Sequence, residues 1–106
     1  GLEILTKSDE WINVTVESDV IVCNIGDMMQ RLTNNYLVST THRVRATESE
    51  YSSSRYSIPF FVHPNPDWLI ETLTNCYNKN NPNLYPQNIL AEEYLQQRLK
   101  EIKLIQ

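Results

Sequence analysis

Short runs of β-branched and aromatic residues, each ending in a polar turn, fill the first two thirds of this 106-residue chain. Residues 2–5 and 11–16 alternate apolar with polar side chains on either side of the polar segment 7–10, which predicts a β-hairpin. Residues 20–25 are almost continuously apolar, which is typical of a strand buried on both faces, with Cys23 as a small core residue. These patterns favour a mainly β domain.

The rest of the chain is predicted to form shorter elements. We expect a helical turn at 28–33, followed by asparagines at 34–35 that can adopt left-handed turn geometry. A strand from 36 or 37 and an extended segment at 41–45 come next. A polar loop at 47–54 then leads to an edge strand at 55–62 that contains Pro59. Prolines and asparagines make residues 63–87 irregular, with one helical turn expected at 67–73. An amphipathic helix with Asn88 as its N-cap is expected at 88–104. We therefore predict a single partial domain, mainly β with a C-terminal α-helix: strands in 1–62, an irregular segment in 63–87 and the helix in 88–104.

Composition limits the classes of partner. The chain has nine Lys and Arg against thirteen Asp and Glu, a formal charge of −4, so neither nucleic acid nor a membrane surface is an expected partner. No apolar run approaches the roughly 20 residues that cross a bilayer, and the first residues lack the order of a signal peptide, so we expect a cytoplasmic protein. Two glycines, Gly1 and Gly26, cannot build a Gly-rich phosphate loop. The two cysteines, Cys23 and Cys76, are expected to be free thiols.

Few residues can carry chemistry. His42 lies in a polar and basic segment, where a lone histidine is more often a hydrogen-bonded side chain than a metal ligand. Arg55 and Ser57 are two residues apart, so in a strand they share a face and can together bind a carboxylate; a surface arginine is the alternative. Arg43 and Arg45 either line the mouth of a site or are solvated.

Several motifs in order resemble a known family. These are Val-Cys-Asn-Ile-Gly-Asp at 22–27, Leu-Thr-Asn at 32–34, Ser-Thr-Thr-His-Arg-Val at 39–44 and Arg-Tyr-Ser-Ile-Pro-Phe-Phe at 55–61. Together with the hairpin before them and the Pro-rich tail after them, they resemble the C-terminal half of the 2-oxoglutarate- and Fe(II)-dependent dioxygenases of the isopenicillin N synthase type. The resemblance covers nearly the whole chain.

The resemblance implies a fold and a reaction. The fold is a double-stranded β-helix, a cupin-like jelly roll, whose mouth holds Fe(II) by two histidines and a carboxylate. By resemblance, His42 matches the distal histidine ligand, and Arg55 with Ser57 matches the pair that binds the distal carboxylate of 2-oxoglutarate or, in some members, a substrate carboxylate. The implied activity is O₂-dependent oxidation of a small organic substrate, coupled to decarboxylation of 2-oxoglutarate to succinate.

The sequence departs from the family in its iron ligands. In the family a His-x-Asp pair precedes the hairpin, whereas this sequence contains no His-x-Asp or His-x-Glu, and His63 in a Pro-rich turn is a poor substitute. We therefore expect an incomplete jelly roll that binds iron weakly and does not turn over alone. Three explanations stay open: a fragment of a longer dioxygenase, which we favour; a barrel completed by a second chain or by self-association; and a non-catalytic carboxylate-binding or interaction module built around Arg55 and Ser57.

Overall fold

The computed structural model describes residues 1–46, 54 and 56–105 of the chain. Contacts within the chain divide it into two compact units, although the sequence shows no boundary and we predicted one domain. The strand unit comprises Gly1–Asn24 and Thr40–Phe60, and the helical unit comprises Ile25–Ser39 and Phe61–Gln106. Each unit therefore has its own internal packing.

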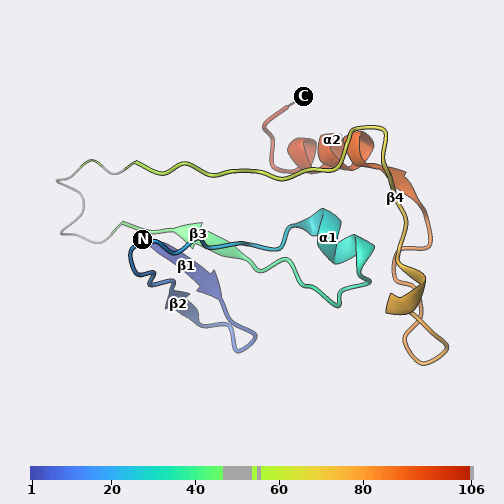
Figure 1. Cartoon of the computed structure of the whole chain (residues 1–106), viewed down its shortest axis with the longest axis horizontal. Helices are drawn as coiled ribbons and strands as arrows, with labels where there is room; N and C mark the ends of the chain where they lie inside the picture. The colour runs from blue at the N-terminus through green and yellow to red at the C-terminus, as the bar shows by residue number, and fades with distance from the viewer. Residues whose placement is uncertain (47–53, 55, 106) are drawn as a thin grey trace. The chain divides into compact units, whose positions relative to one another are not determined.

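A small antiparallel sheet forms the strand unit. It consists of β1 (Leu2–Leu5), β2 (Trp11–Asn13) and β3 (His42–Val44), in the order β2-β1-β3 (Figure 1). The predicted hairpin is confirmed: β1 pairs with β2, the Thr6 N–H donates to the Glu10 carbonyl at 2.9 Å, and Asp9 takes the left-handed φ of 60° that the turn requires. The predicted extended segment at 41–45 is confirmed as β3, which pairs with the other edge of β1.

Pairing register decides which side chains share a face of this sheet. Ile4 lies opposite both Ile12 and His42, and Glu3 lies opposite both Asn13 and Arg43. Because directly paired residues in an antiparallel sheet point to the same face, and neighbours along a strand to opposite faces, two sets of side chains result. The first is Leu2, Ile4, Ile12, His42 and Val44; the second is Glu3, Leu5, Trp11, Asn13 and Arg43.

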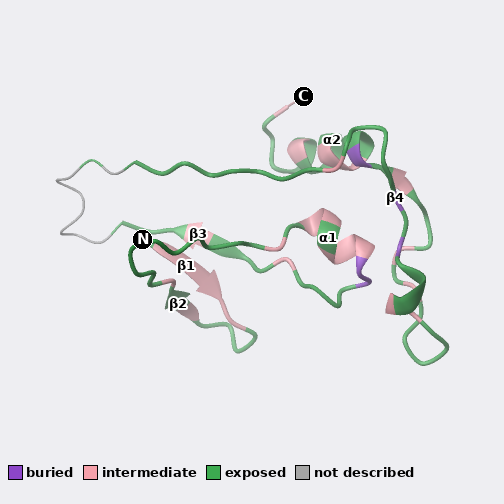
Figure 2. Ribbon diagram, viewed as in Figure 1, coloured by how far each residue is buried: buried purple, intermediate pink, exposed green. Residues whose placement is uncertain are grey.

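Three predicted strands are wrong for the described residues. Residues 20–25 form no strand: Ile21 is 88% exposed and Cys23 is exposed instead of belonging to the core. No strand begins at 36 or 37, and residues 56–62 run as an extended, unpaired segment in which Ile58 is 95% exposed (Figure 2). The physical reason is shared: apolar strands need ladder partners and covered faces, and the described residues place no strand beside these segments. The predicted loop at 47–54 lies almost wholly outside the described residues.

The helical unit begins with α1 (Asp27–Leu32), which confirms the predicted helical turn. It ends, as predicted, in two left-handed asparagines, Asn34 with φ of 49° and Asn35 with φ of 64°. The expected helical turn at 67–73 is wrong, because β4 (Leu69–Ile70) pairs there with β5 (Ile89–Leu90). The 3-10 helix η2 (Thr74–Cys76) follows β4.

The C-terminal helix is shorter than predicted. Helix α2 (Ala91–Glu101) starts three residues after Asn88, because Ile89 and Leu90 are engaged in the strand pair. Asn88 is therefore not its N-cap; instead the Glu93 carboxylate accepts a hydrogen bond from the Leu90 backbone N–H at 3.3 Å. Among the described residues, no helix is long and apolar enough to cross a membrane. By its elements the chain is mainly β with a C-terminal helix, as predicted.

Polar side chains make up much of the small core of the helical unit. Buried residues lie at the end of α1, along β4 and at the start of α2 (Figure 2). They are Thr33, Asn34, Ile70, Thr72 and Ala91. The amide nitrogen of Asn34 donates to the carbonyls of Cys76 at 3.2 Å and Pro82 at 3.1 Å, and its Oδ1 accepts from the Leu84 N–H at 2.8 Å. One buried amide thus connects the end of α1 to the loop after η2.

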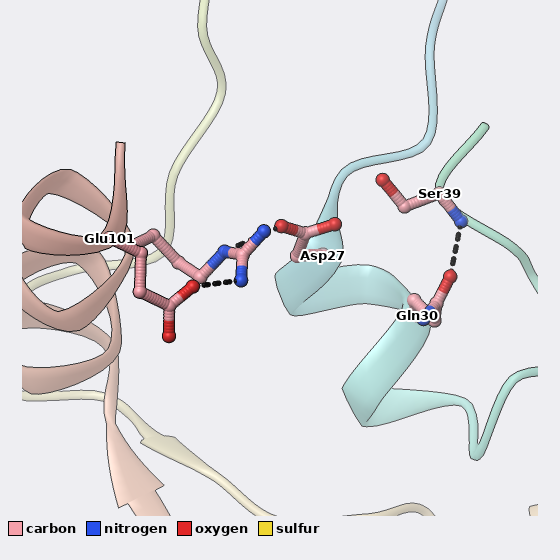
Figure 3. A network of polar contacts seen from close by, with 5 residues as sticks. Asp27, Gln30, Ser39 and Glu101 are labelled. Carbon is pink, nitrogen blue, oxygen red and sulfur yellow. Dashed lines mark hydrogen bonds and ion pairs between the residues drawn. The ribbon is translucent and has the colours of Figure 1, made fainter. Parts of the chain in front are cut away.

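Charged side chains connect α1 to α2. Nε of Arg98 lies 2.8 Å from Oδ2 of Asp27, and Arg98 also pairs with Glu101. Figure 3 labels the two carboxylates, Asp27 on α1 and Glu101 on α2. On the same helix as Asp27, the side-chain carbonyl of Gln30 accepts the Ser39 backbone N–H at 2.6 Å. Because these side chains are partly exposed, each ion pair contributes no more than about 1 kcal/mol to the free energy of unfolding.

Candidate functional site

His42, the predicted metal ligand, lies in a regular element of the described chain. It is the first residue of β3, opposite Ile4 of β1, and its side chain is exposed. Its Nδ1 lies 3.0 Å from the carbonyl oxygen of Thr40. Because a carbonyl can only accept, this contact assigns the proton to Nδ1, and in the neutral ring Nε2 then keeps its lone pair. This is the tautomer in which an imidazole can bind a metal through Nε2 while its other nitrogen is held by the protein.

The sheet face around His42 is apolar. Its other members are Leu2, Ile4, Ile12 and Val44, and Val44 is 67% exposed. No charged side chain belongs to this face of the described sheet.

The opposite face of the same sheet carries a compact polar cluster. Nε of Arg43 lies 2.7 Å from Oε2 of Glu3, and the guanidinium carbon lies 3.9 Å from the centroid of the Trp11 ring. The Glu3 side chain is only 12% exposed. In the described sheet Arg43 thus lies on the face opposite His42, where it pairs with Glu3 and stacks on Trp11 while its side chain stays 39% exposed. Arg45 lies just beyond β3, is exposed, and donates its backbone N–H to the Gly1 carbonyl at 2.7 Å.

Sequence reasoning missed this cluster, although a signal was present. Glu3 is the polar residue between Leu2 and Ile4, and Arg43 follows His42 directly. Strand alternation alone places each of them on the face opposite its neighbours. What the sequence does not show is that β1 lies between β2 and β3, which brings Trp11 within reach of Arg43.

The carboxylate-binding pair is only half described. Arg55 lies outside the described residues. Ser57 is exposed within the extended segment 56–62, which has no strand partner among the described residues. The convergence of Arg55 and Ser57 on one carboxylate therefore stays a prediction.

His63 belongs to the helical unit. Its ring stacks parallel to that of Phe61, with centroids 6.2 Å apart. It also lines a small open cavity of about 150 Å³ together with Met28, Glu92 and Leu95, among others. Glu92 is the one carboxylate in that lining, so the cavity offers two candidate ligands and not a facial triad.

The metal-binding side chains of the described residues do not form a complete iron site. Within the described ranges, no three His, Cys, Asp or Glu side chains are grouped so that they could hold a metal ion. A facial triad needs two imidazoles and a carboxylate, and the described residues offer one imidazole nitrogen at the predicted site. The residues described here fit one position of such a triad and do not by themselves fit an iron site.

Comparisons with known proteins agree with the motifs. The family model described as the 2OG-Fe(II) oxygenase superfamily matches residues 1–64. A 2-oxoglutarate-Fe(II) type oxidoreductase of Emericella nidulans is 37% identical, and the match covers 81% of this chain and 24% of the relative. The azadirone synthase of Melia azedarach is 30% identical, and the match covers 96% of this chain and 30% of the relative. The chain belongs to the 2OG-Fe(II) oxygenase superfamily, a class of oxidoreductases, which confirms the resemblance seen in its motifs.

Solved structures give the same family. A crystal structure of a protein assigned to the 2OG-Fe(II) oxygenase family of Caulobacter crescentus is 48% identical, with a TM-score of 0.89 over 96% of this chain and 34% of that one. A full-length Neurospora crassa protein crystallised in complex with alpha-KG is 29% identical, with a TM-score of 0.80; the match covers 94% of this chain and 33% of that protein. The same Neurospora crassa protein is also known in complex with alpha-KG and thymine. This chain spans about a quarter to a third of the length of these relatives.

Proposed function

We propose that this chain is the part of a 2-oxoglutarate- and Fe(II)-dependent dioxygenase that contributes one histidine ligand, His42, and the carboxylate-binding pair Arg55 and Ser57. The observation that carries the proposal is the orientation of His42, whose Nδ1 is held by the Thr40 carbonyl so that Nε2 is free. The family match over residues 1–64 includes all three proposed site residues.

Each proposed residue has a defined task. His42 would offer the Nε2 lone pair as one of three protein ligands. The guanidinium of Arg55 and the hydroxyl of Ser57 would bind a carboxylate of 2-oxoglutarate through charge-assisted hydrogen bonds. When bound, iron and 2-oxoglutarate supply the oxidising chemistry, which converts O₂ and 2-oxoglutarate to CO₂ and succinate while a small organic substrate is oxidised.

The other two ligands and the remaining strands come, we infer, from outside these 106 residues, in the same polypeptide or in a second chain. Two observations support this inference: the sequence contains no His-x-Asp pair, and the apolar segments at 20–22 and 56–62 are exposed. Exposed, unpaired apolar segments are what further strands of a double-stranded β-helix would pair with and cover. The chain alone is then an incomplete jelly roll that binds iron weakly and does not turn over.

A graft into a complete relative tests this proposal. This chain replaces the corresponding third of the Caulobacter crescentus protein, to which it is 48% identical with a TM-score of 0.89. We expect the graft to form succinate from 2-oxoglutarate with Fe(II) and O₂, as measured against the parent protein. Where the parent shows no turnover, the absorption band of Fe(II) with bound 2-oxoglutarate in the absence of O₂ serves as the readout.

Variants of the graft separate the residue roles. His42→Ala should abolish succinate formation, whereas His63→Ala should leave it unchanged. Arg55→Gln should raise the KM for 2-oxoglutarate by roughly tenfold to a hundredfold, because a hydrogen bond between charged groups contributes about 1.5–3 kcal/mol. Full activity of the His42→Ala graft would show that His42 is not a ligand, and the proposal would fall.

The source of the missing parts is a separate question. Sedimentation of the 106-residue chain at several concentrations measures its mass in solution. A monomer at every concentration argues against self-association and favours a longer polypeptide. A concentration-dependent dimer favours completion by a second copy.

A further inference from the structure

We propose that Glu3, Arg43 and Trp11 form a clasp that positions the His42 imidazole from the opposite face of the sheet. The inference rests on the proposed function, since it concerns how the proposed ligand is held. The clasp uses one residue from each strand: Trp11 from β2, Glu3 from β1 and Arg43 from β3. None of the three lies on the face of His42.

The contacts of the clasp cross the whole sheet. Arg43 and Glu3 are directly paired residues with an N–O distance of 2.7 Å, and the guanidinium reaches over β1 to lie 3.9 Å from the centre of the Trp11 ring. A guanidinium that stacks on an indole and pairs with a carboxylate at once is held in one orientation. The Glu3 side chain is 12% exposed, so solvent screens this pair less than an ordinary surface ion pair.

Strand alternation links the clasp to His42. Arg43 follows His42 directly, so fixing Arg43 on one face fixes His42 on the other. A shift of the β1–β3 pairing by one residue would bring Arg43 onto the apolar face and turn His42 away from it. Backbone hydrogen bonds also hold this register, among them Leu5 N–H to the Thr41 carbonyl at 2.9 Å and Arg45 N–H to the Gly1 carbonyl at 2.7 Å. Because β3 has only three residues, the side-chain clasp adds to a short ladder.

The Thr40 contact makes the positioning measurable. The Nδ1–H of His42 meets the Thr40 carbonyl two residues earlier in the same extended segment. Loosening β3 would separate these two groups, and the imidazole would then shift toward the Nε2–H tautomer that free histidine prefers. The tautomer ratio therefore reports on the position of His42 without requiring metal or turnover.

The test is long-range ¹H–¹⁵N NMR of the imidazole in the 106-residue chain, at a pH about two units above the usual histidine pKa of about 6.5. We expect Nδ1–H to dominate in the unaltered chain, and to fall to less than half of the population in Arg43→Gln and in Glu3→Gln. Arg43→Lys, which keeps the charge but loses the planar fork, should give an intermediate ratio. Trp11→Leu should also lower the Nδ1–H share.

Arg45→Gln is the matched control. Arg45 has the same charge, lies two residues further along and is exposed, so its loss should leave the tautomer ratio unchanged. Where Arg43→Gln loses the hairpin signals altogether, the exchanged pair Glu3→Arg with Arg43→Glu replaces it and should restore the Nδ1–H form. An unchanged ratio in both Arg43→Gln and Glu3→Gln, or an equal change in Arg45→Gln, overturns the clasp.

The two proposals can fail separately. If His42 is not a ligand, the His42→Ala graft stays active while the tautomer ratio still responds to Arg43→Gln. If the clasp is wrong, the tautomer ratio does not respond, while the His42→Ala graft is still inactive.

Discussion

Replacing Asn34 by alanine should destabilise the helical unit more than most single substitutions. Its amide makes three hydrogen bonds, to Cys76, Pro82 and Leu84, and the residue is 4% exposed. Each lost bond costs about 1 kcal/mol, and alanine at the left-handed φ of 49° adds about 1 kcal/mol. We therefore expect Asn34→Ala to lower the free energy of unfolding by about 4 kcal/mol, a large share of the stability of a small unit.

Urea unfolding followed by tryptophan fluorescence measures this loss. Trp68 lies in the helical unit and Trp11 in the strand unit, so a Trp11→Phe background makes the signal report on the helical unit alone. Asn34→Gly serves as the matched control, because glycine loses the same hydrogen bonds without the strain of a left-handed φ. It should lose about 3 kcal/mol.

Two results would contradict this reasoning. A loss below about 1 kcal/mol in Asn34→Ala would mean that water or neighbouring groups replace the amide. An equal loss in both variants would mean that the left-handed backbone carries no strain. Asn34→Asp adds a check, because an anion facing two carbonyls should destabilise the unit more at neutral pH than in acid.

Three further results are expected in the helical unit. Burial, followed by the negative charge of Asp27, raises the pKa of the Tyr94 phenol above its ordinary value near 10. The folded state then favours the neutral phenol. Its contribution to the free energy of unfolding is complete below about pH 10 and is lost as pH rises from there through the raised pKa. Urea unfolding across this pH range should show a smaller loss of stability in Tyr94→Phe than in the unaltered chain. Ile70→Ala should cost about 3 kcal/mol in the same assay, because Ile70 is 1% exposed and its removal leaves a cavity; a cost below about 1 kcal/mol would mean that the site collapses. A double-mutant cycle on Asp27 and Arg98 should give a coupling under about 1 kcal/mol that weakens with added salt, and a salt-independent coupling would count against a partly exposed pair.

Local patterns predicted the elements that depend on neighbours along the chain. The hairpin around Asp9, helix α1 and the left-handed pair Asn34-Asn35 were all recognisable, because turn geometry and short helices depend on a few adjacent residues. Pairing partners decided the elements that were mispredicted. The segment 67–73 holds a strand because Leu69 and Ile70 meet β5, a partner about twenty residues later.

The candidate site divides in the same way. The His42 motif and the Arg55-x-Ser57 spacing identified the family from the sequence, and the comparisons confirm that family. Neither motif shows that Arg43 turns away from His42 toward Glu3. That arrangement depends on the strand order β2-β1-β3, which joins residues about forty positions apart.

The sequence by itself determined the family, the hairpin and the residue types available for chemistry, because motifs, alternation and turn residues are local properties of the chain. Only the tertiary structure decided which apolar runs became strands, where α2 begins, and which side chains share a face with His42. Burial and strand pairing join distant residues, so an apolar run such as 20–25 is a strand only where other strands cover it.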